Sequence, residues 1–510
     1  MVAGELTERA EARRTQALAL IDPRRQAALG QFFTPQGAAT LIASMPTLPA
    51  AGTLRVLDPG AGSGSLTAAL VSRALEESPN LRLEVVAVEI DSAVVAQLRA
   101  TLEDAAKTAK SLGRHVKTKV VVGDFVDIAS RQLVPSLSKP FDLVIMNPPY
   151  RKLSAASQHR IALAKLGVDC PNLYAAFVAL AAKALAPNGQ LVAITPQSFT
   201  NGPHFSEFRH FILQHLTLNR IHLFKSRSTV FSDTGVLQEN IVFSATRGGP
   251  EADVTILSSH GHADSPVSLR VRYDQVVLPG DTEKFIRVPS TGTDLALAQT
   301  MAKLPCRLSE LKLRVSTGKV VDFRSTQYLR DDPCSDCVPL VYPGNLRSGI
   351  VEWPRGIRKP QGFLPKDLGA QKLLLPSGCY VVVKRFSAKE ERKRVVAAVW
   401  DPKLNGNKPI AFENHLNVIH SDGAGLSRDL AVGLSLWLNS TFVDRAFRTF
   451  SGHTQVNATD LRSMRFPNEE TLSSLGSGQP LALPEQEKID ALVAVATPTA
   501  WVECSSTAPR

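Results

Sequence analysis

Residues 141–150 read Phe-Asp-Leu-Val-Ile-Met-Asn-Pro-Pro-Tyr, and this stretch decides the fold. The apolar run 141–146 is short and β-prone, so it predicts a buried strand. The proline pair ends that strand in a rigid turn, because proline lacks a backbone N–H and fixes φ. The carboxyl ends of strands carry the binding site in open α/β sheets. We therefore expect the last four residues to line a site: Asn147, Pro148, Pro149 and Tyr150.

These four residues also suit a particular chemical task. The Asn147 side-chain oxygen and the Pro148 carbonyl can each accept one N–H bond. Two such acceptors would draw the lone pair of a conjugated amino or amide nitrogen out of its π system and aim it at an electrophile. Tyr150 offers a face on which a planar base could stack. An ordinary strand-to-turn segment with a surface tyrosine is the alternative interpretation.

Three similar strand ends precede this stretch. A strand ending at Leu57 runs into Asp58-Pro59-Gly60-Ala61-Gly62-Ser63-Gly64, followed by a helical pattern over 66–75. The glycines permit close backbone approach, but no Gly-Lys-Ser/Thr follows, so this is not a Walker loop. The next strand, 83–90, places an acid, Glu89, where a ribose diol is held. The third, 119–122, is followed by Asp124 and Phe125, which could meet an adenine ring.

In this order, the four strand ends resemble an S-adenosylmethionine-dependent amino-methyltransferase. Residues 30–35, Gly-Gln-Phe-Phe-Thr-Pro, are similar to the segment before the glycine-rich loop of gamma-class adenine-specific DNA methyltransferases from restriction-modification systems. The resemblance covers roughly residues 20–245. It implies methyl transfer from S-adenosylmethionine to N6 of an adenine that is flipped out of a specific double-stranded DNA sequence.

The resemblance also implies roles for individual residues. Catalysis and base binding would fall to Asn147, Pro148, Pro149 and Tyr150, and a phenylalanine would stack on the other face of the base. Phe231 in Val230-Phe231 is the best local match, although Ser232 replaces the expected proline. No metal is implied, because the sulfonium is already a strong electrophile. The residues expected to bind the cofactor are Phe33, Thr34, Pro35, Asp58, Gly60, Gly62, Glu89, Ile90, Asp124 and Phe125.

The chain is long enough for two or more domains. Alternating strand and helix patterns over 51–200 predict an α/β fold, a Rossmann-like methyltransferase domain with a mainly parallel sheet. Mixed patterns after the linker candidate 246–250 predict an α+β target recognition domain. The expected divisions are a helical lead-in over 1–30, the catalytic domain over 31–248, the recognition domain over 251–475 and a tail over 476–510.

The basic charge is concentrated in the second half of the chain. Net charge is +11, and residues 341–400 hold twelve Lys and Arg against four Asp and Glu. Interleaved aromatic residues make this a candidate DNA-contacting region, although part of it could be solvated surface. The residues expected to bind DNA are Lys384, Arg385, Arg392, Lys393 and Arg394. The polar string 451–462 resembles the closing segment of target recognition regions, or is a loop capped at Thr459 or Asp460 before a helix.

Composition limits the remaining possibilities. The chain has no apolar run long enough to span a membrane and no secretory signal pattern, and its six cysteines suit reduced thiols in a cytoplasm. Cys334 and Cys337 have zinc-compatible spacing without a second ligand pair nearby, so a plain loop is the alternative to a metal site. A cognate restriction endonuclease is a possible partner.

Other functions remain open at this point. A protein-glutamine methyltransferase also uses Asn-Pro-Pro-Tyr, on an amide, and an RNA amino-methyltransferase is a further possibility. A different class of function is a methyltransferase-like subunit that recognises DNA within a defence complex.

Overall fold

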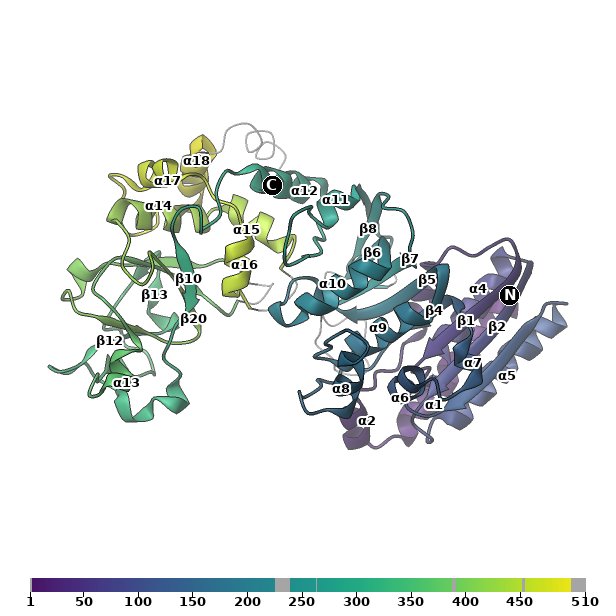
Figure 1. Ribbon diagram of the computed structural model, residues 1–510. Coiled ribbons are helices and arrows are strands. Elements are labelled where there is room, and N and C mark those ends of the chain that lie inside the picture. Colours follow the sequence, from purple (N-terminus) through teal and green to yellow (C-terminus); the bar gives the residue numbers. More distant parts are fainter. Residues whose placement is uncertain (1, 225–238, 263, 388–390, 452–454, 497–510) are drawn as a thin grey trace. The chain divides into compact units, whose positions relative to one another are not determined.

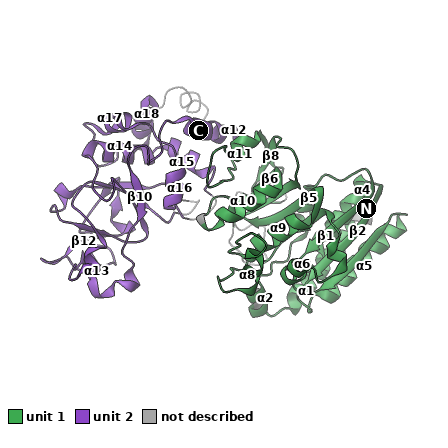
Figure 2. Ribbon diagram, in the orientation of Figure 1, with its two compact units in different colours: residues 1–290 green, residues 291–510 purple. Residues whose placement is uncertain are grey.

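The computed structural model describes residues 2–224, 239–262, 264–387, 391–451 and 455–496 (Figure 1). The chain divides into two compact units, Met1–Ser290 and Thr291–Arg510 (Figure 2). Among the described residues, no helix is long and apolar enough to cross a membrane.

Unit 1 is built on a nine-stranded sheet with the order β3-β2-β1-β4-β5-β7-β6-β8-β9. The first five strands are parallel to one another, and β7 runs antiparallel between β5 and β6. Strand order reverses between β1 and β4, which is where open α/β sheets form a ligand crevice. The strands are β1 (Ala51–Pro59), β2 (Asn80–Glu89), β3 (Val116–Val122), β4 (Phe141–Met146), β5 (Leu185–Pro196), β6 (Leu216–Phe224), β7 (Asn240–Arg247), β8 (Val254–Ser259) and β9 (Val267–Val271).

Helices cover both faces of this sheet, because right-handed crossovers on either side of the reversal place their helices on opposite faces. One group, α1, α3, α4 and α5, packs together, and α6, α9 and α10 form the other. The helices of unit 1 are α1 (Val2–Leu20), α2 (Pro23–Leu29), α3 (Gln36–Ser44), α4 (Ser65–Glu77), α5 (Val95–Ser111), α6 (Phe125–Arg131), α7 (Pro135–Ser138), α8 (Gln158–Ala164), α9 (Leu173–Ala184), α10 (Ser206–His215) and α11 (Tyr273–Val276). The predicted Rossmann-like fold is confirmed.

The expected domain boundary differs from the structure. The expected linker 246–250 is a connection inside the sheet, because β8 follows it and pairs with β6. The two units instead divide after Ser290. Within β5, Asn188 has φ 62°, and the pairing with β4 shifts register between Phe141 and Leu143.

Unit 2 contains two smaller sheets, so its α+β character is as predicted. The six-stranded sheet has the order β10-β20-β17-β18-β14-β13, and the five-stranded sheet has the order β11-β15-β12-β19-β16. The strands are β10 (Arg314–Thr317), β11 (Leu329–Arg330), β12 (Val338–Val341), β13 (Leu346–Arg347), β14 (Ile350–Val351), β15 (Gly362–Phe363), β16 (Leu374–Leu375), β17 (Tyr380–Lys384), β18 (Ala397–Trp400), β19 (Ile410–Phe412) and β20 (Leu416–His420).

Helices of unit 2 pack on the six-stranded sheet and on each other. Gly433 on α14 and Gly476 on α17 allow a close approach, since a Cβ on Gly433 would lie 1.8 Å from the Leu472 carbonyl oxygen. The N-cap of α16 is Asn457, whose N–H donates to Asp460, so neither Thr459 nor Asp460 is the cap residue. The helices are α12 (Gly292–Lys303), α13 (Leu368–Gln371), α14 (Arg428–Leu438), α15 (Thr441–Arg448), α16 (Ala458–Ser463), α17 (Glu469–Gly476) and α18 (Gln486–Ala496).

The cysteine pair in unit 2 corrects a prediction. Cys334 and Cys337 are joined in a disulfide, with their Cα atoms 5.0 Å apart. The expectation of reduced thiols is therefore wrong for this pair, and its sulfurs are not metal ligands here. Cys170, Cys306 and Cys379 are free thiols.

Candidate active site

A cleft of about 880 Å³, including its open mouth, lies at the carboxyl edge of the unit 1 sheet. The ends of β1, β2, β3 and β4 meet there, as parallel strands require. Most of the residues predicted to bind a cofactor line it: Phe33, Thr34, Gly60, Gly62, Glu89, Ile90, Asp124 and Phe125. Asn147 and Pro149 from the predicted catalytic segment line the same cleft.

Glu89 forms hydrogen bonds with several segments at this edge of the sheet. Its carboxylate, only 2% exposed, accepts hydrogen bonds from the backbone N–H groups of Gly62 and Asp91, both at 2.7 Å. Gln31 Nε2 donates to it at 3.3 Å. Burial raises the pKa of Glu89, while the backbone donors favour the charged form. One side chain therefore positions the glycine-rich loop and the segment before it, with acceptor capacity left for a ligand.

The glycine-rich loop packs closely against the rings of Phe177 and Phe33. Gly60 has φ 74°, and a Cβ there would lie 3.3 Å from the Phe177 ring. Gly62 has φ 56°, and a Cβ would lie 3.1 Å from the Phe33 ring. Side chains at these positions would strain the backbone and fill the cleft.

Asp58 lies beneath the loop and not in the cleft lining. It is 1% exposed, and its Oδ2 accepts a 2.7 Å hydrogen bond from the Thr67 hydroxyl. Its Oδ1 is buried without a hydrogen-bond partner among the described residues. Burial raises the pKa of Asp58 to about 7. The structure thus ties Asp58 to Thr67 of α4, and Pro35, the N-cap residue of α3, also lies outside the cleft lining.

Asp124 and Phe125 shape the far end of the cleft. Asp124 Oδ1 caps α6 by accepting from the N–H groups of Val126 and Asp127 at 2.7 and 3.2 Å. Its Oδ2 lies 3.3 Å from His159 Nε2. Burial alone would raise the pKa of Asp124, but His159 and the helix cap together lower it. Ligand atoms of Asp124, Asp127 and His159 lie within 4.8 Å of one another, but such groups of acidic residues are common without a bound ion, and we assign no metal to them.

Asn147 is held in one orientation. Its Nδ2 donates to the Phe32 carbonyl at 2.7 Å and to the Thr34 hydroxyl at 3.1 Å. Because a carbonyl oxygen can only accept, this contact fixes which end of the amide carries the hydrogens. The Oδ1 atom is thus left as an acceptor. One structural role of the segment 30–35 is therefore to orient the Asn147 side chain, through Phe32 and Thr34.

Tyr150 lies beside this acceptor, outside the cleft lining. Its hydroxyl donates to Asn147 Oδ1 at 3.1 Å, and burial raises its pKa. Its ring is 5.4 Å from that of Phe32 and makes an edge contact with Tyr174. Pro148 is buried behind the turn. Phe231, predicted to stack on the base, lies outside the described residues.

Sequence reasoning missed several residues of the cleft. Gln31, Phe32, Arg151 and Phe177 line it, and none belongs to the strand-end motifs. Gln31 and Phe32 belong to the quoted segment 30–35 and could have been included. Arg151, exposed directly after Tyr150, and Phe177, on α9, gave no sequence signal, because only the packing of helices against strand ends brings them there.

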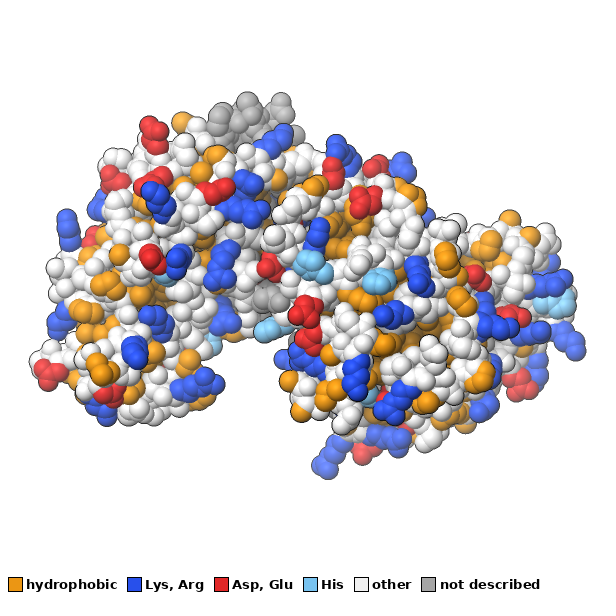
Figure 3. All heavy atoms as spheres, in the orientation of Figure 1, with side chains coloured by type: hydrophobic (Ala, Val, Ile, Leu, Met, Phe, Trp, Pro, Cys, Tyr) orange, Lys and Arg blue, Asp and Glu red, His pale blue; other side chains and the backbone are white. Residues whose placement is uncertain are grey.

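The predicted DNA-binding residues differ in their exposure and contacts. Lys and Arg side chains occur on both units on the face drawn in Figure 3. Arg392 is exposed, and Arg385 is partly exposed. Lys384 pairs with Glu391 at 2.9 Å, and the partly buried Lys393 donates to the Asn439 carbonyl.

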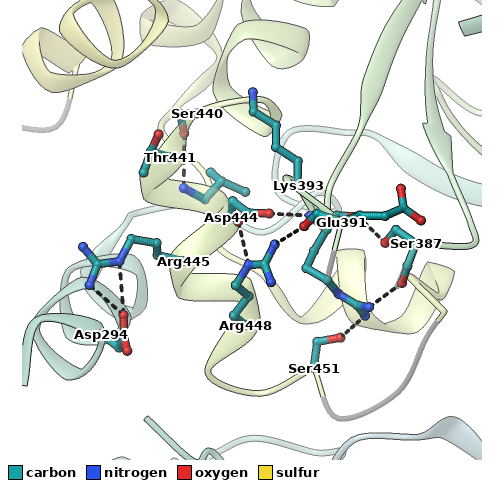
Figure 4. Close-up of polar contacts among 12 residues, drawn as sticks. Asp294, Ser387, Glu391, Lys393, Ser440, Thr441, Asp444, Arg445, Arg448 and Ser451 are labelled. Atoms are coloured by element: carbon teal, nitrogen blue, oxygen red, sulfur yellow. Dashed lines mark hydrogen bonds and ion pairs between the residues drawn. The ribbon is translucent and has the colours of Figure 1, made fainter. Parts of the chain in front are cut away.

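The predicted DNA-binding role of Arg394 is wrong. It is fully buried, its guanidinium donates to Ser387 and Ser451, and its backbone N–H donates to Asp444 at 2.5 Å. Figure 4 shows Asp444 at the centre of this network, which also includes Arg448. Since the Arg394 side chain is fully buried and hydrogen-bonded within unit 2, it is not available to DNA.

The comparisons with known proteins agree with this geometry. A profile of the Eco57I restriction-modification methylase family matches residues 90–231. The chain is 38% identical to the type II methyltransferase M.BsuBI of Bacillus subtilis, over 91% of this chain and 94% of that one. It is 37% identical to the type II methyltransferase M.PstI of Providencia stuartii, over 94% and 95%.

One solved structure has a similar fold over the whole chain. The type IIL restriction-modification enzyme MmeI, in complex with DNA, aligns with a TM-score of 0.54 and 13% identity, covering 100% of this chain and 74% of that one. Fold and site define a Rossmann-like methyltransferase. The chain belongs to the family of type II methyltransferases of restriction-modification systems, and is a DNA methyltransferase. The protein-glutamine and RNA alternatives fall away.

Asp58 makes stability depend on pH. Its folded pKa of about 7 lies above its ordinary value of 3.8, so its contribution to stability is full below pH 4 and is lost as pH rises through 7. Asp58→Asn should therefore become more stable relative to the parent between pH 4 and pH 8, by up to about 4 kcal/mol. Denaturant unfolding without added cofactor measures this. The exposed Asp253→Asn should show no such trend, and a pH-independent difference for Asp58→Asn would contradict the assignment.

Proposed function

We propose that this protein transfers a methyl group from S-adenosylmethionine to the N6 amino group of an adenine in a defined double-stranded DNA sequence. The observation that carries the proposal is the fixed orientation of Asn147, which leaves Oδ1 as an acceptor next to the cleft. Amino-group methylation needs such an acceptor, because the adenine nitrogen is a poor nucleophile while its lone pair is conjugated.

The cleft fits the cofactor chemically. Glu89 offers a buried carboxylate for the ribose hydroxyls, and charge-assisted bonds of this kind are strong. Ile90, 43% exposed although apolar, and Phe125 offer surface against which an adenine ring would pack. Asp124 would accept from the adenine amino group, and Phe33 and Thr34 would flank the methionine end. When bound, the cofactor supplies a methyl group on a sulfonium, which needs no metal to activate it.

The residues of the turn would act on the target base. Asn147 Oδ1 and the Pro148 carbonyl would accept the two amino hydrogens, so that the nitrogen lone pair points at the methyl group. Tyr150 would exchange its hydrogen bond to Asn147 for a stacked position on the base, with Phe231 on the other face. The proton leaves after the nitrogen has become cationic, so no base needs to act first. Positioning supplies most of the acceleration.

Unit 2 would select the DNA sequence, since the residues proposed for cofactor and chemistry all lie in unit 1. A cognate restriction endonuclease is the proposed partner, and the cytoplasm, where cellular DNA lies, is the proposed location. Methylation-sensitive single-molecule sequencing of DNA from an expressing host tests the function. N6-methyladenine at one defined sequence is expected, and its absence would refute the proposal.

Asn147→Ala should lower the methyl-transfer rate by at least ~10²-fold, the scale of losing one positioned hydrogen-bond partner in a transition state. Single-turnover kinetics on the methylated sequence measure this, and cofactor affinity should change little. Asn80→Ala, exposed at the opposite edge of the sheet, is the matched control. A parent-like rate for Asn147→Ala would remove the catalytic role.

Glu89→Ala should weaken S-adenosylmethionine binding by about ten-fold or more, because each charge-assisted hydrogen bond contributes roughly 1.5–3 kcal/mol. Titration calorimetry measures the affinity. Glu84→Ala on the same strand, with a side chain 46% exposed, should bind as the parent does. Equal affinities for Glu89→Ala and parent would mean that a different group holds the ribose.

A further inference from the structure

Three loops of unit 2 that are far apart in sequence meet at one edge of the six-stranded sheet. Residues 318–325 follow β10, residues 385–387 follow β17, and residues 413–415 precede β20. The strand pairs Thr317–Asn417 and Lys384–Leu416 place all three at the same end. Val320 also pairs with Glu413, and Arg385 N–H donates to the His415 carbonyl at 3.0 Å. We call these three loops the aromatic edge.

Exposed aromatic side chains are concentrated there. Among all Phe, Tyr and Trp residues in the described part of the chain, only Phe323 and Phe386 are exposed, at 75% and 39%. Both belong to the aromatic edge. His415 adds a third planar side chain, with its ring 5.1 Å from that of Phe386. A single exposed apolar residue is ordinary, but both exposed rings lie on loops at the same end of one sheet, which indicates a binding surface.

The loop that carries Phe323 is fixed on either side of it. Asp322 accepts from the Tyr342 hydroxyl at 3.0 Å and from Lys359 Nζ at 2.8 Å. Ser325, on the other side, is buried. The backbone of Val320 exchanges hydrogen bonds with its neighbours, donating to Phe412 and accepting from Asn414. The ring is thus presented to solvent by a rigid support, so little conformational entropy is lost when it binds.

The charge of the aromatic edge suits a polyanion. Lys319 and Arg324 are exposed, and the Arg324 guanidinium carbon lies 5.3 Å from the centre of the Phe323 ring. The acids nearby are already engaged, Asp322 with Lys359 and Glu413 with His415 at 2.5 Å. Positive charge beside exposed rings matches the phosphates and stacked bases of DNA.

We propose that the aromatic edge contacts the DNA duplex and that Phe323 inserts into the base stack as a wedge that favours base flipping. This rests on the proposed function above. A flipped adenine leaves its neighbours unstacked, and an inserted apolar ring replaces part of the lost stacking. Arg324 and Lys319 would hold the flanking phosphates.

The test compares matched and mismatched substrates. On a duplex carrying the sequence found by methylome sequencing, Phe323→Ala should lower kcat/KM by about ten-fold or more, because unstacking costs a few kcal/mol. On the same duplex with a mismatch opposite the target adenine, the loss should shrink to about two-fold, since a mispaired base is flipped more easily. With 2-aminopurine at the target position, Phe323→Ala should show less fluorescence increase than the parent on the matched duplex.

Two variants control for other causes. Leu404→Ala removes a side chain that is 61% exposed at the opposite end of the sheet, after β18, and should behave as the parent. Phe323→Trp should retain activity, because it keeps a large ring. Equal rates for Phe323→Ala and parent, or a loss that the mismatch does not reduce, would overturn the wedge. A parent enzyme that methylates no adenine would refute the proposed function, and not this inference alone.

Discussion

The buried carboxylate of Glu89 is the interaction on which the candidate active site depends. It joins the glycine-rich loop after β1, the residues after β2 and the segment before α3 through hydrogen bonds to Gly62, Asp91 and Gln31. A buried charge is tolerated only when it is well paired, and here backbone donors do the pairing. Removing these donors would leave the charge unsatisfied, so loop geometry and carboxylate position are set together. One carboxylate thereby connects three of the segments that form the cleft.

A second hydrogen bond connects the segment before α3 to the proposed catalytic residue Asn147. The Phe32 carbonyl orients the Asn147 amide, and Phe33 packs on Gly62 of the loop. Consecutive residues of one short segment therefore touch both the proposed cofactor site and the proposed catalytic group. Cofactor loop and acceptor oxygen are thereby held at a fixed distance, as in-line transfer between a bound donor and a positioned nitrogen requires.

Unit 2 uses its basic residues in two ways. Arg394 and Lys393 were both predicted to bind DNA. Arg394 instead donates to Ser387 and Ser451, and Lys393 donates to Asn439. Exposed positive charge occurs instead beside the rings of the aromatic edge, formed by loops that the sequence separates widely. Local charge density therefore overestimates the binding surface, because burial, and not composition, decides which charges face solvent.

Local sequence patterns were sufficient to predict a mainly parallel Rossmann-like sheet, most of the cleft residues at its four strand ends and the family, because parallel strands bring their carboxyl ends to one edge and each end carries its own motif. The tertiary structure was needed for everything that depends on packing between distant segments. It buried Asp58 and raised its pKa, brought Arg151 and Phe177 into the cleft, moved the unit boundary to Ser290, and joined Cys334 to Cys337. Local patterns encode strands and turns, whereas burial and the pairing of charges follow from contacts that no local pattern contains.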